Sequence, residues 1–109
     1  MKRWLLPLAV IVVLWGTFLA SAAEELTLII RDHRFEPAVL EIPAGKKVRL
    51  VVKNLDPTPE EFDSAALNRE KVIAGGGEGA IWIGPLDAGA YDFIGEYHAD
   101  TAKGQVIAK

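Results

Sequence analysis

The sequence predicts an all-β fold: a Greek-key β-sandwich of about eight strands that follows a cleavable signal peptide. Short runs of β-branched, aromatic and other apolar residues recur along residues 24–109, and clusters of Gly, Pro, Asn and Asp separate them. No stretch between these runs sustains the 3.6-residue period of an amphipathic helix. Many short strands in a small domain are typical of sandwiches, in which two sheets cover each other's apolar faces.

Four strands are expected in the first half of this domain. Residues 26–30 form an apolar run, and residues 39–42 end at a Pro-Ala-Gly-Lys turn. Residues 47–53 alternate polar and apolar at first and then become continuously apolar, which indicates a more fully buried strand. Two prolines break the pattern in residues 54–59, and residues 61–63 open the next strand.

Four more strands are expected in the second half. Residues 70–74 precede a glycine-rich turn, and residues 80–83 follow it. Residues 90–94 alternate clearly, and residues 105–108 close the chain. The segment 64–69 is long enough for one short helical turn.

The start of the chain is typical of a secretory signal peptide. Two basic residues are followed by an apolar run from Leu5 to Leu19, and small residues end at Ala23. The sequence therefore predicts a signal peptide over residues 1–23, a single domain over residues 24–109, and export to the periplasm.

Charge limits the classes of partner. All 15 acidic residues follow Ala23, whereas two of the 12 Lys and Arg precede it, so cleavage changes the formal charge from −3 to about −5. An acidic domain is poorly suited to nucleic acids or anionic membranes and is compatible with cations or a basic protein surface.

Four short pieces of the sequence form a recognisable series, together with His98 and Gly104. They are Phe35-Glu36-Pro37, residues 42–45 (IPAG), residues 48–54 (VRLVVKN) and residues 85–93 (PLDAGAYDF). Their order and spacing resemble those of the cupredoxins over essentially the whole of residues 24–109. The resemblance implies a cupredoxin-like Greek-key sandwich.

The metal ligands of the cupredoxins match poorly. A blue-copper site needs a Cys thiolate, two His and usually an axial Met, yet the chain has no Cys. The resemblance places Gly95 at the thiolate position and retains His98. It places Glu60 or Glu61 where the upstream His is expected, and Ala102 near the Met position. Ordinary blue-copper electron transfer is therefore excluded.

The replacements themselves form a pattern. Residues 60–63 and 95–104 look like those of the cupredoxin-like proteins of bacterial periplasmic iron-uptake systems. Those systems pair such a domain with a second periplasmic metal-binding protein and an inner-membrane permease. The resemblance implies handling of iron, with copper as an alternative or helper ion.

Five residues are candidate metal ligands: His98, Glu60, Glu61, Glu96 and Asp100. His98 stands at a ligand position of the resembled fold, and the carboxylates flank it or lie on the turn beside it. One imidazole with carboxylates suits iron, manganese or Cu(II) better than Cu(I).

Two questions about these candidates stay open from sequence. Neighbouring residues of a strand face opposite sides, so only one of Glu60 and Glu61 can point at the site. Counting from Asn54 favours Glu60, whereas the Glu-Phe-Asp pattern favours Glu61. For His33, a surface position beside a charged turn is favoured over a role as second imidazole.

Three functions from different classes fit these observations. The leading hypothesis is a binding and delivery module that passes an iron ion to or from a partner of an uptake system. The second is a ferroxidase-like enzyme that oxidises Fe(II) before transport and uses an outside electron acceptor such as bound Cu(II). The third is a metal-free interaction module that has kept only the sandwich.

Overall fold

The computed structural model of this protein describes residues 24–109. The predicted signal peptide lies outside the described residues, so its cleavage and the export of the chain stay predictions. Within residues 24–109, no helix is long and apolar enough to cross a membrane.

The expected all-β fold is confirmed. All eight expected strands are present with small differences at their ends, and one short strand, β2, is added. The segment expected to allow a helical turn is a hairpin turn, in which Leu67 N–H donates to Ser64 Oγ (3.0 Å). The strands are β1 (Glu24–Arg31), β2 (Arg34–Glu36), β3 (Val39–Ile42), β4 (Val48–Asn54), β5 (Glu60–Ser64), β6 (Arg69–Ile73), β7 (Glu78–Ile83), β8 (Gly89–Gly95) and β9 (Lys103–Ala108), and a short 3₁₀ helix, η1, spans Glu96–His98.

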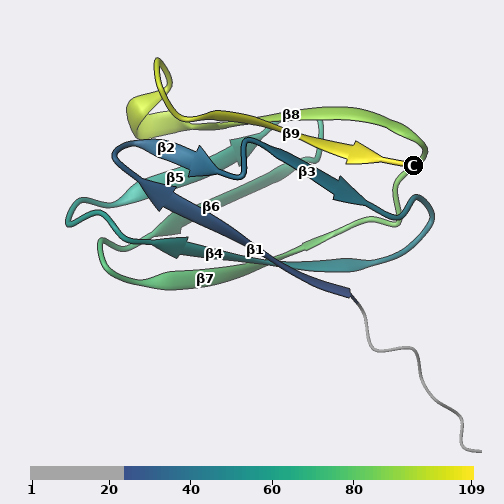
Figure 1. Ribbon diagram of the computed structural model, residues 1–109, viewed down its shortest axis with the longest axis horizontal. Helices are drawn as coiled ribbons and strands as arrows, with labels where there is room; N and C mark the ends of the chain where they lie inside the picture. The colour runs from purple at the N-terminus through teal and green to yellow at the C-terminus, as the bar shows by residue number, and fades with distance from the viewer. Residues whose placement is uncertain (1–23) are drawn as a thin grey trace, which may run out of the picture.

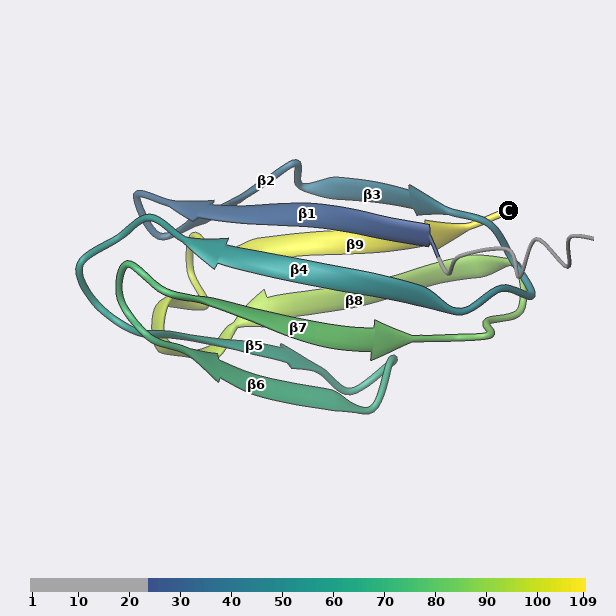
Figure 2. The same ribbon diagram turned by 90° about the horizontal axis from the view of Figure 1, so that it is seen from below.

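The strands form two sheets that pack face to face (Figure 1). One sheet has the order β2-β1-β4-β7 and the other has the order β3-β9-β8-β5-β6. The chain crosses repeatedly between the sheets, so β1 lies parallel to β4 and β3 lies parallel to β9, whereas the other neighbours are antiparallel. Figure 2 shows strands β1, β4 and β7 of the first sheet lying over the second sheet and running roughly along its strands.

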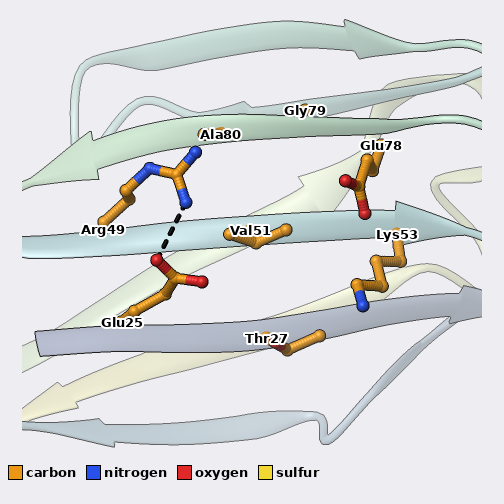
Figure 3. Close-up of a pocket in the computed structure, with 8 residues that line it drawn as sticks. All are labelled: Glu25, Thr27, Arg49, Val51, Lys53, Glu78, Gly79 and Ala80. Carbon is orange, nitrogen blue, oxygen red and sulfur yellow. Dashed lines mark hydrogen bonds and ion pairs between the residues drawn. The ribbon is translucent and has the colours of Figure 1, made fainter.

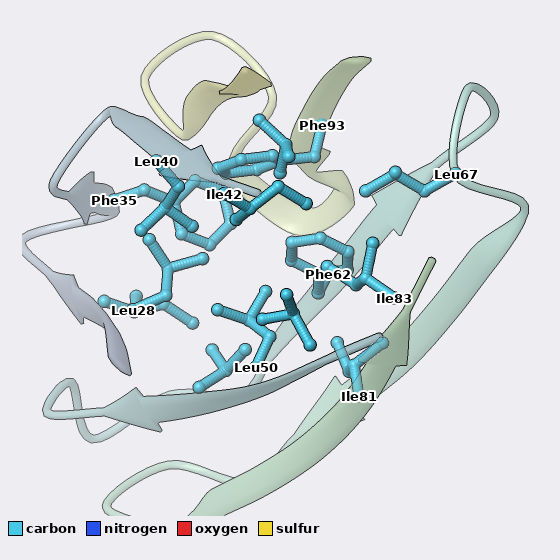
Figure 4. Close-up of a cluster of buried hydrophobic side chains, with 14 of the residues drawn as sticks. Leu28, Phe35, Leu40, Ile42, Leu50, Phe62, Leu67, Ile81, Ile83 and Phe93 are labelled. Carbon is cyan, nitrogen blue, oxygen red and sulfur yellow. The ribbon is translucent and has the colours of Figure 1, made fainter. Parts of the chain in front are cut away.

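A cluster of apolar side chains fills the space between the sheets (Figure 4). Three phenylalanines from both sheets meet in it: the ring of Phe93 lies 5.0 Å from the rings of Phe35 and Phe62, measured between centroids. Edge-on and tilted packing of this kind adds to the free energy of burying the rings. The aromatic cluster therefore joins β2 of one sheet to β5 and β8 of the other.

The outer face of the four-stranded sheet is polar. Arg49 of β4 forms an ion pair with Glu25 of β1 (2.9 Å), and Lys53 and Glu78 lie further along the same face (Figure 3). These side chains border an open hollow of about 270 Å³. Exposed ion pairs of this kind contribute about 0–1 kcal/mol, so this pair adds little to the stability of the fold.

Four connections meet at the end of the sandwich opposite the C-terminus (Figures 1 and 2). They are the β1–β2 turn, the β4–β5 loop, the β6–β7 turn and the segment from β8 through η1 to β9. Backbone hydrogen bonds tie them together, such as Gly76 N–H to Asp56 O (2.9 Å). This end brings three of the predicted metal residues close to one another: Glu60, His98 and Asp100.

The aromatic cluster predicts a large effect of one core substitution. Phe62→Ala is expected to lower the free energy of unfolding by about 3–5 kcal/mol, because Phe62 is fully buried and its removal leaves a cavity. Urea denaturation measures the change, and Val72→Ala, on the exposed face of β6, serves as the control with an expected change within about 0.5 kcal/mol. Similar losses in both variants would contradict the assigned core.

Candidate metal site

Glu60 begins strand β5 and is a buried carboxylate. The strand alternates, so Glu60, Phe62 and Ser64 point inward whereas Glu61 and Asp63 point outward. Only 1% of the surface of Glu60 is exposed, although a buried carboxylate is costly unless hydrogen bonds compensate for the lost water. Glu60 is therefore the member of the predicted pair that faces the interior.

The carboxylate of Glu60 is held by three donors. Oε1 accepts hydrogen bonds from the backbone N–H of Glu61 (3.0 Å) and of Tyr97 (2.9 Å). Oε2 accepts a hydrogen bond from Nδ1 of His98 at 2.5 Å. Both carboxylate oxygens are thus occupied, and among the described residues no buried side-chain polar atom lacks a partner. Glu60 orients His98 and leaves the other ring nitrogen, Nε2, as the available ligand atom.

The Glu60 carboxylate also explains the glycine at the thiolate position. A Cβ placed on Gly95 would lie 2.7 Å from Cδ of Glu60 and 2.6 Å from Cβ of Ala102, both too short for real contacts. Gly95 N–H donates to Ala102 O (2.9 Å), which closes the loop. The buried carboxylate and a thiolate cannot both occupy this space. The residues present therefore do not fit a blue-copper centre.

His33 lies against His98, which corrects the surface position favoured from sequence. Its side chain is half-buried, and the centroids of the two imidazole rings are 3.5 Å apart in an edge-on arrangement. His33 belongs to the β1–β2 turn of the four-stranded sheet, whereas His98 ends η1, which connects β8 and β9 of the five-stranded sheet. The structure thus brings a second imidazole to the predicted one.

Asp56 is a site residue that sequence reasoning missed. This buried carboxylate accepts hydrogen bonds from the backbone N–H of Asp32 (2.8 Å) and His33 (3.0 Å), and its own N–H donates to Asn54 Oδ1 (3.0 Å). Burial raises the pKa of Asp56, but these N–H donors and the nearby imidazoles of His33 and His98 outweigh it, so the pKa lies below its ordinary value of 3.8. From the sequence, residues 54–56 (Asn-Leu-Asp) at the end of β4 predicted only a break in the strand pattern.

The two imidazoles open onto a hollow of about 560 Å³. Asp32, Tyr97, Asp100 and Thr101 line it together with the His rings and Ala99. Asp100 is exposed there. Glu96 does not line the hollow; its charge acts on Glu61 instead.

Glu61 belongs to a different group of carboxylates on the outer face of β5 and β6. Oxygen atoms of Glu61, Asp63 and Glu70 lie within 4.8 Å of one another, and in the part of the chain that the structure describes this is the group of three close enough to hold one metal ion. Burial and then repulsion from Glu70, Asp63, Glu96 and Glu60 raise the pKa of Glu61. Exposed acidic groups often cluster without binding an ion, so this group is the second place to test.

Most of the chain matches a known family. A model of the cupredoxin-like domain matches residues 5–108. The chain therefore belongs to the cupredoxin-like domain family.

One curated relative and several solved structures are similar. An uncharacterized protein of Rickettsia prowazekii is 41% identical over 83 residues, which cover 76% of this chain and 66% of the relative, slightly less than two thirds of its length. The metal-binding domain of the Cu(I)-exporting P-type ATPase CopA of Streptococcus pneumoniae superposes with a TM-score of 0.72 at 15% identity, covering 84% of this chain and 90% of that one.

Two copper proteins show the same architecture. Auracyanin A, a blue copper protein of Chloroflexus aurantiacus, has a TM-score of 0.69 at 12% identity over 81% of this chain and all (100%) of that one. Amicyanin of Paracoccus versutus has a TM-score of 0.59 at 20% identity, covering 83% and 86% of the two chains. At these identities the likeness shows the fold alone. It confirms the sandwich and does not identify a metal or its ligands in this chain.

Restoring the thiol is predicted not to restore a blue-copper site. Gly95→Cys is expected to destabilise the fold by about 1–3 kcal/mol, because the new side chain meets Glu60 and Ala102. On addition of Cu(II), absorption spectroscopy is expected to show no intense thiolate-to-copper band. Ala66→Cys, on the exposed β5–β6 turn, is the matched thiol control. An intense blue species in the Gly95 variant alone would contradict the steric argument.

The lowered pKa of Asp56 predicts a pH dependence of stability. Because the folded pKa is below the unfolded value of 3.8, the stabilisation by this carboxylate is present above pH 3.8 and lost as the pH falls through the folded pKa. Asp56→Asn is expected to cost about 1–3 kcal/mol near neutral pH, and less in acid. Urea denaturation between about pH 6 and pH 2 measures this, with the exposed Asp87→Asn as control. A difference from wild type that is independent of pH would contradict the assignment.

Proposed function

We propose that this protein is a periplasmic metal-binding module that binds an iron ion through a His and carboxylate site and hands it to a partner in metal uptake. The observation that carries the proposal is the pair formed by buried Glu60 and His98. A carboxylate hydrogen-bonded to one nitrogen of an imidazole is the arrangement by which proteins orient metal-binding His residues.

The hydrogen bond determines what His98 offers to an ion. Because Glu60 accepts a hydrogen bond from Nδ1–H, neutral His98 presents an unprotonated Nε2. Of the His98 side chain, 26% is exposed, at the hollow. The negative charge behind the ring makes the imidazole a better donor. Asp100, like Asp32, lies on the wall of the same hollow, and either carboxylate can approach the bound ion.

The site has features of delivery rather than storage. It is an open hollow at the end of the sandwich, and its protein donors are few, so several coordination positions are left to water or to a ligand from a partner. Imidazole and carboxylate donors suit iron and Cu(II) and disfavour Cu(I). The acidic character of residues 24–109 favours cations near this end.

The partners follow from the resemblance. In iron-uptake systems with such a domain, the expected partners are a second periplasmic metal-binding protein and an inner-membrane permease. Iron is then the cargo, and copper is a helper ion or an alternative ion.

The proposal predicts metal binding that depends on His98. Calorimetric titration of residues 24–109 with Fe(III), Cu(II) and Mn(II) is expected to show binding of Fe(III) and Cu(II) that His98→Ala weakens by more than about 100-fold, since the oriented donor is lost. Absence of binding in the unaltered chain would overturn both the delivery and the ferroxidase functions and favour an interaction module.

Adjacent glutamates provide a matched control. Glu60→Gln is expected to weaken binding about 10–100-fold, because the amide no longer holds His98 as a carboxylate does, whereas Glu61→Gln should leave affinity unchanged. Circular dichroism checks that both variants are folded. The opposite result would place the ion at the outer group of Glu61, Asp63 and Glu70.

The same preparation separates delivery from oxidation. Oxygen-dependent loss of Fe(II) over many turnovers, with bound Cu(II) as electron acceptor, would favour the ferroxidase-like enzyme. Stoichiometric binding without turnover supports delivery.

A further inference from the structure

We propose that His33 is a second imidazole ligand of the ion bound by His98, and that Asp56 and Thr101 are the positioning residues that hold it there. This inference rests on the proposed function, because it concerns the same ion. It adds a ligand that sequence reasoning placed on the surface and two residues outside the predicted set.

The β1–β2 turn places His33 in an unusual backbone conformation. Asp32 and His33 both have positive φ, 51° and 58°, and form the two-residue loop of the hairpin between β1 and β2. A two-residue hairpin turn of this kind requires positive φ at both positions, and Asp and His are among the non-glycine residues that adopt positive φ most often. Residues held in such conformations persist where their surroundings determine them, often at functional sites.

Two side chains from elsewhere in the chain determine this turn. The buried carboxylate of Asp56 in the β4–β5 loop accepts the N–H of Asp32 and of His33. From the opposite side, Thr101 Oγ1 donates to the carbonyl of His33 at 2.6 Å. The backbone of His33 is therefore fixed at both its N–H and its C=O by segments 23 and 68 positions away in sequence.

The fixed backbone directs the His33 ring to His98. The centroids of the two rings lie 3.5 Å apart with an angle of 62° between their planes, so the two imidazoles are in direct contact. Both rings line the same open hollow. Thr101 also lies within the loop that carries His98, so one segment positions both imidazoles.

A second imidazole narrows the class of ion. Imidazole donors suit Cu(II), Fe, Ni and Zn, whereas sites of carboxylate and water alone suit Mg, Ca and Mn. With two imidazoles, one of them hydrogen-bonded to the Glu60 carboxylate, the site prefers Cu(II) and iron to Mn(II). The remaining coordination positions face the hollow, where Asp100 or a partner's ligand reaches the ion.

The test uses Cu(II) alone as the probe. Calorimetry gives affinity, and electron paramagnetic resonance of the Cu(II) complex reports how many nitrogen atoms bind. His33→Gln is expected to weaken Cu(II) binding at least about tenfold and to remove one nitrogen from the spectrum, with Arg34→Gln on neighbouring β2 as the unchanged control.

The positioning residues are tested by substitutions of matched size. Thr101→Val keeps the shape but cannot donate to His33 O, so it is expected to weaken Cu(II) binding and reduce the fraction of complexes with two nitrogens, whereas Thr101→Ser should restore both. Urea denaturation of each variant shows that the fold is intact, and Asp56→Asn provides a second variant with the same expected spectrum.

The outcomes separate this inference from the proposed function. If His98→Ala abolishes binding while His33→Gln keeps the affinity and the two-nitrogen spectrum of the unaltered chain, the role of His33 is overturned and a site at His98 stands. If the unaltered chain does not bind Cu(II) or Fe(III), both fail. A one-nitrogen spectrum for the unaltered chain also overturns the inference.

Discussion

The buried carboxylate of Glu60, hydrogen-bonded to His98, is the interaction on which the rest of this end of the molecule depends. A charge with 1% exposure needs full compensation, and it draws donors from its own strand, from η1 and from the imidazole. Gly95 can have no side chain because the carboxylate fills that space, and Ala102 must stay small. The absence of a thiolate at Gly95 and the presence of the Glu60 carboxylate therefore have the same steric cause. The ligand set is correspondingly harder than that of a blue-copper site.

The alternation of strand β5 gives two adjacent carboxylates opposite roles. Glu60 faces the interior and meets donors, so its charge is used to orient a ligand. Glu61 is half-buried on the outer face beside Asp63 and Glu70, and partial burial together with repulsion from these carboxylates raises its pKa. A shift of one residue in the pairing of β5 would exchange these roles. The pairing of Phe62 with Gly95 therefore fixes the chemistry as well as the sheet.

Most of the fold could be predicted from sequence because strand periodicity and turn residues are local signals. Strand β2 was missed because three residues are too few to show a period. Sequence could also predict that His98 and one glutamate would meet, but not which one, since the first residue of β5 depends on its pairing with β8. The positions of His33 and Asp56 could not be predicted, because hydrogen bonds between distant segments determine them and neither residue has a motif of its own.

The positions of the two imidazoles have a mechanical consequence. His33 extends from the sheet of β1 and β2, whereas Glu60 and the segment carrying His98 belong to the other sheet. An ion held by both rings would therefore connect the two sheets at this end of the sandwich. Binding of the ion would then make this end of the sandwich more rigid, and release of the ion would make it more flexible. By the same coupling, a partner that moves the β1–β2 turn away from its neighbours would lower the affinity of the site for the ion.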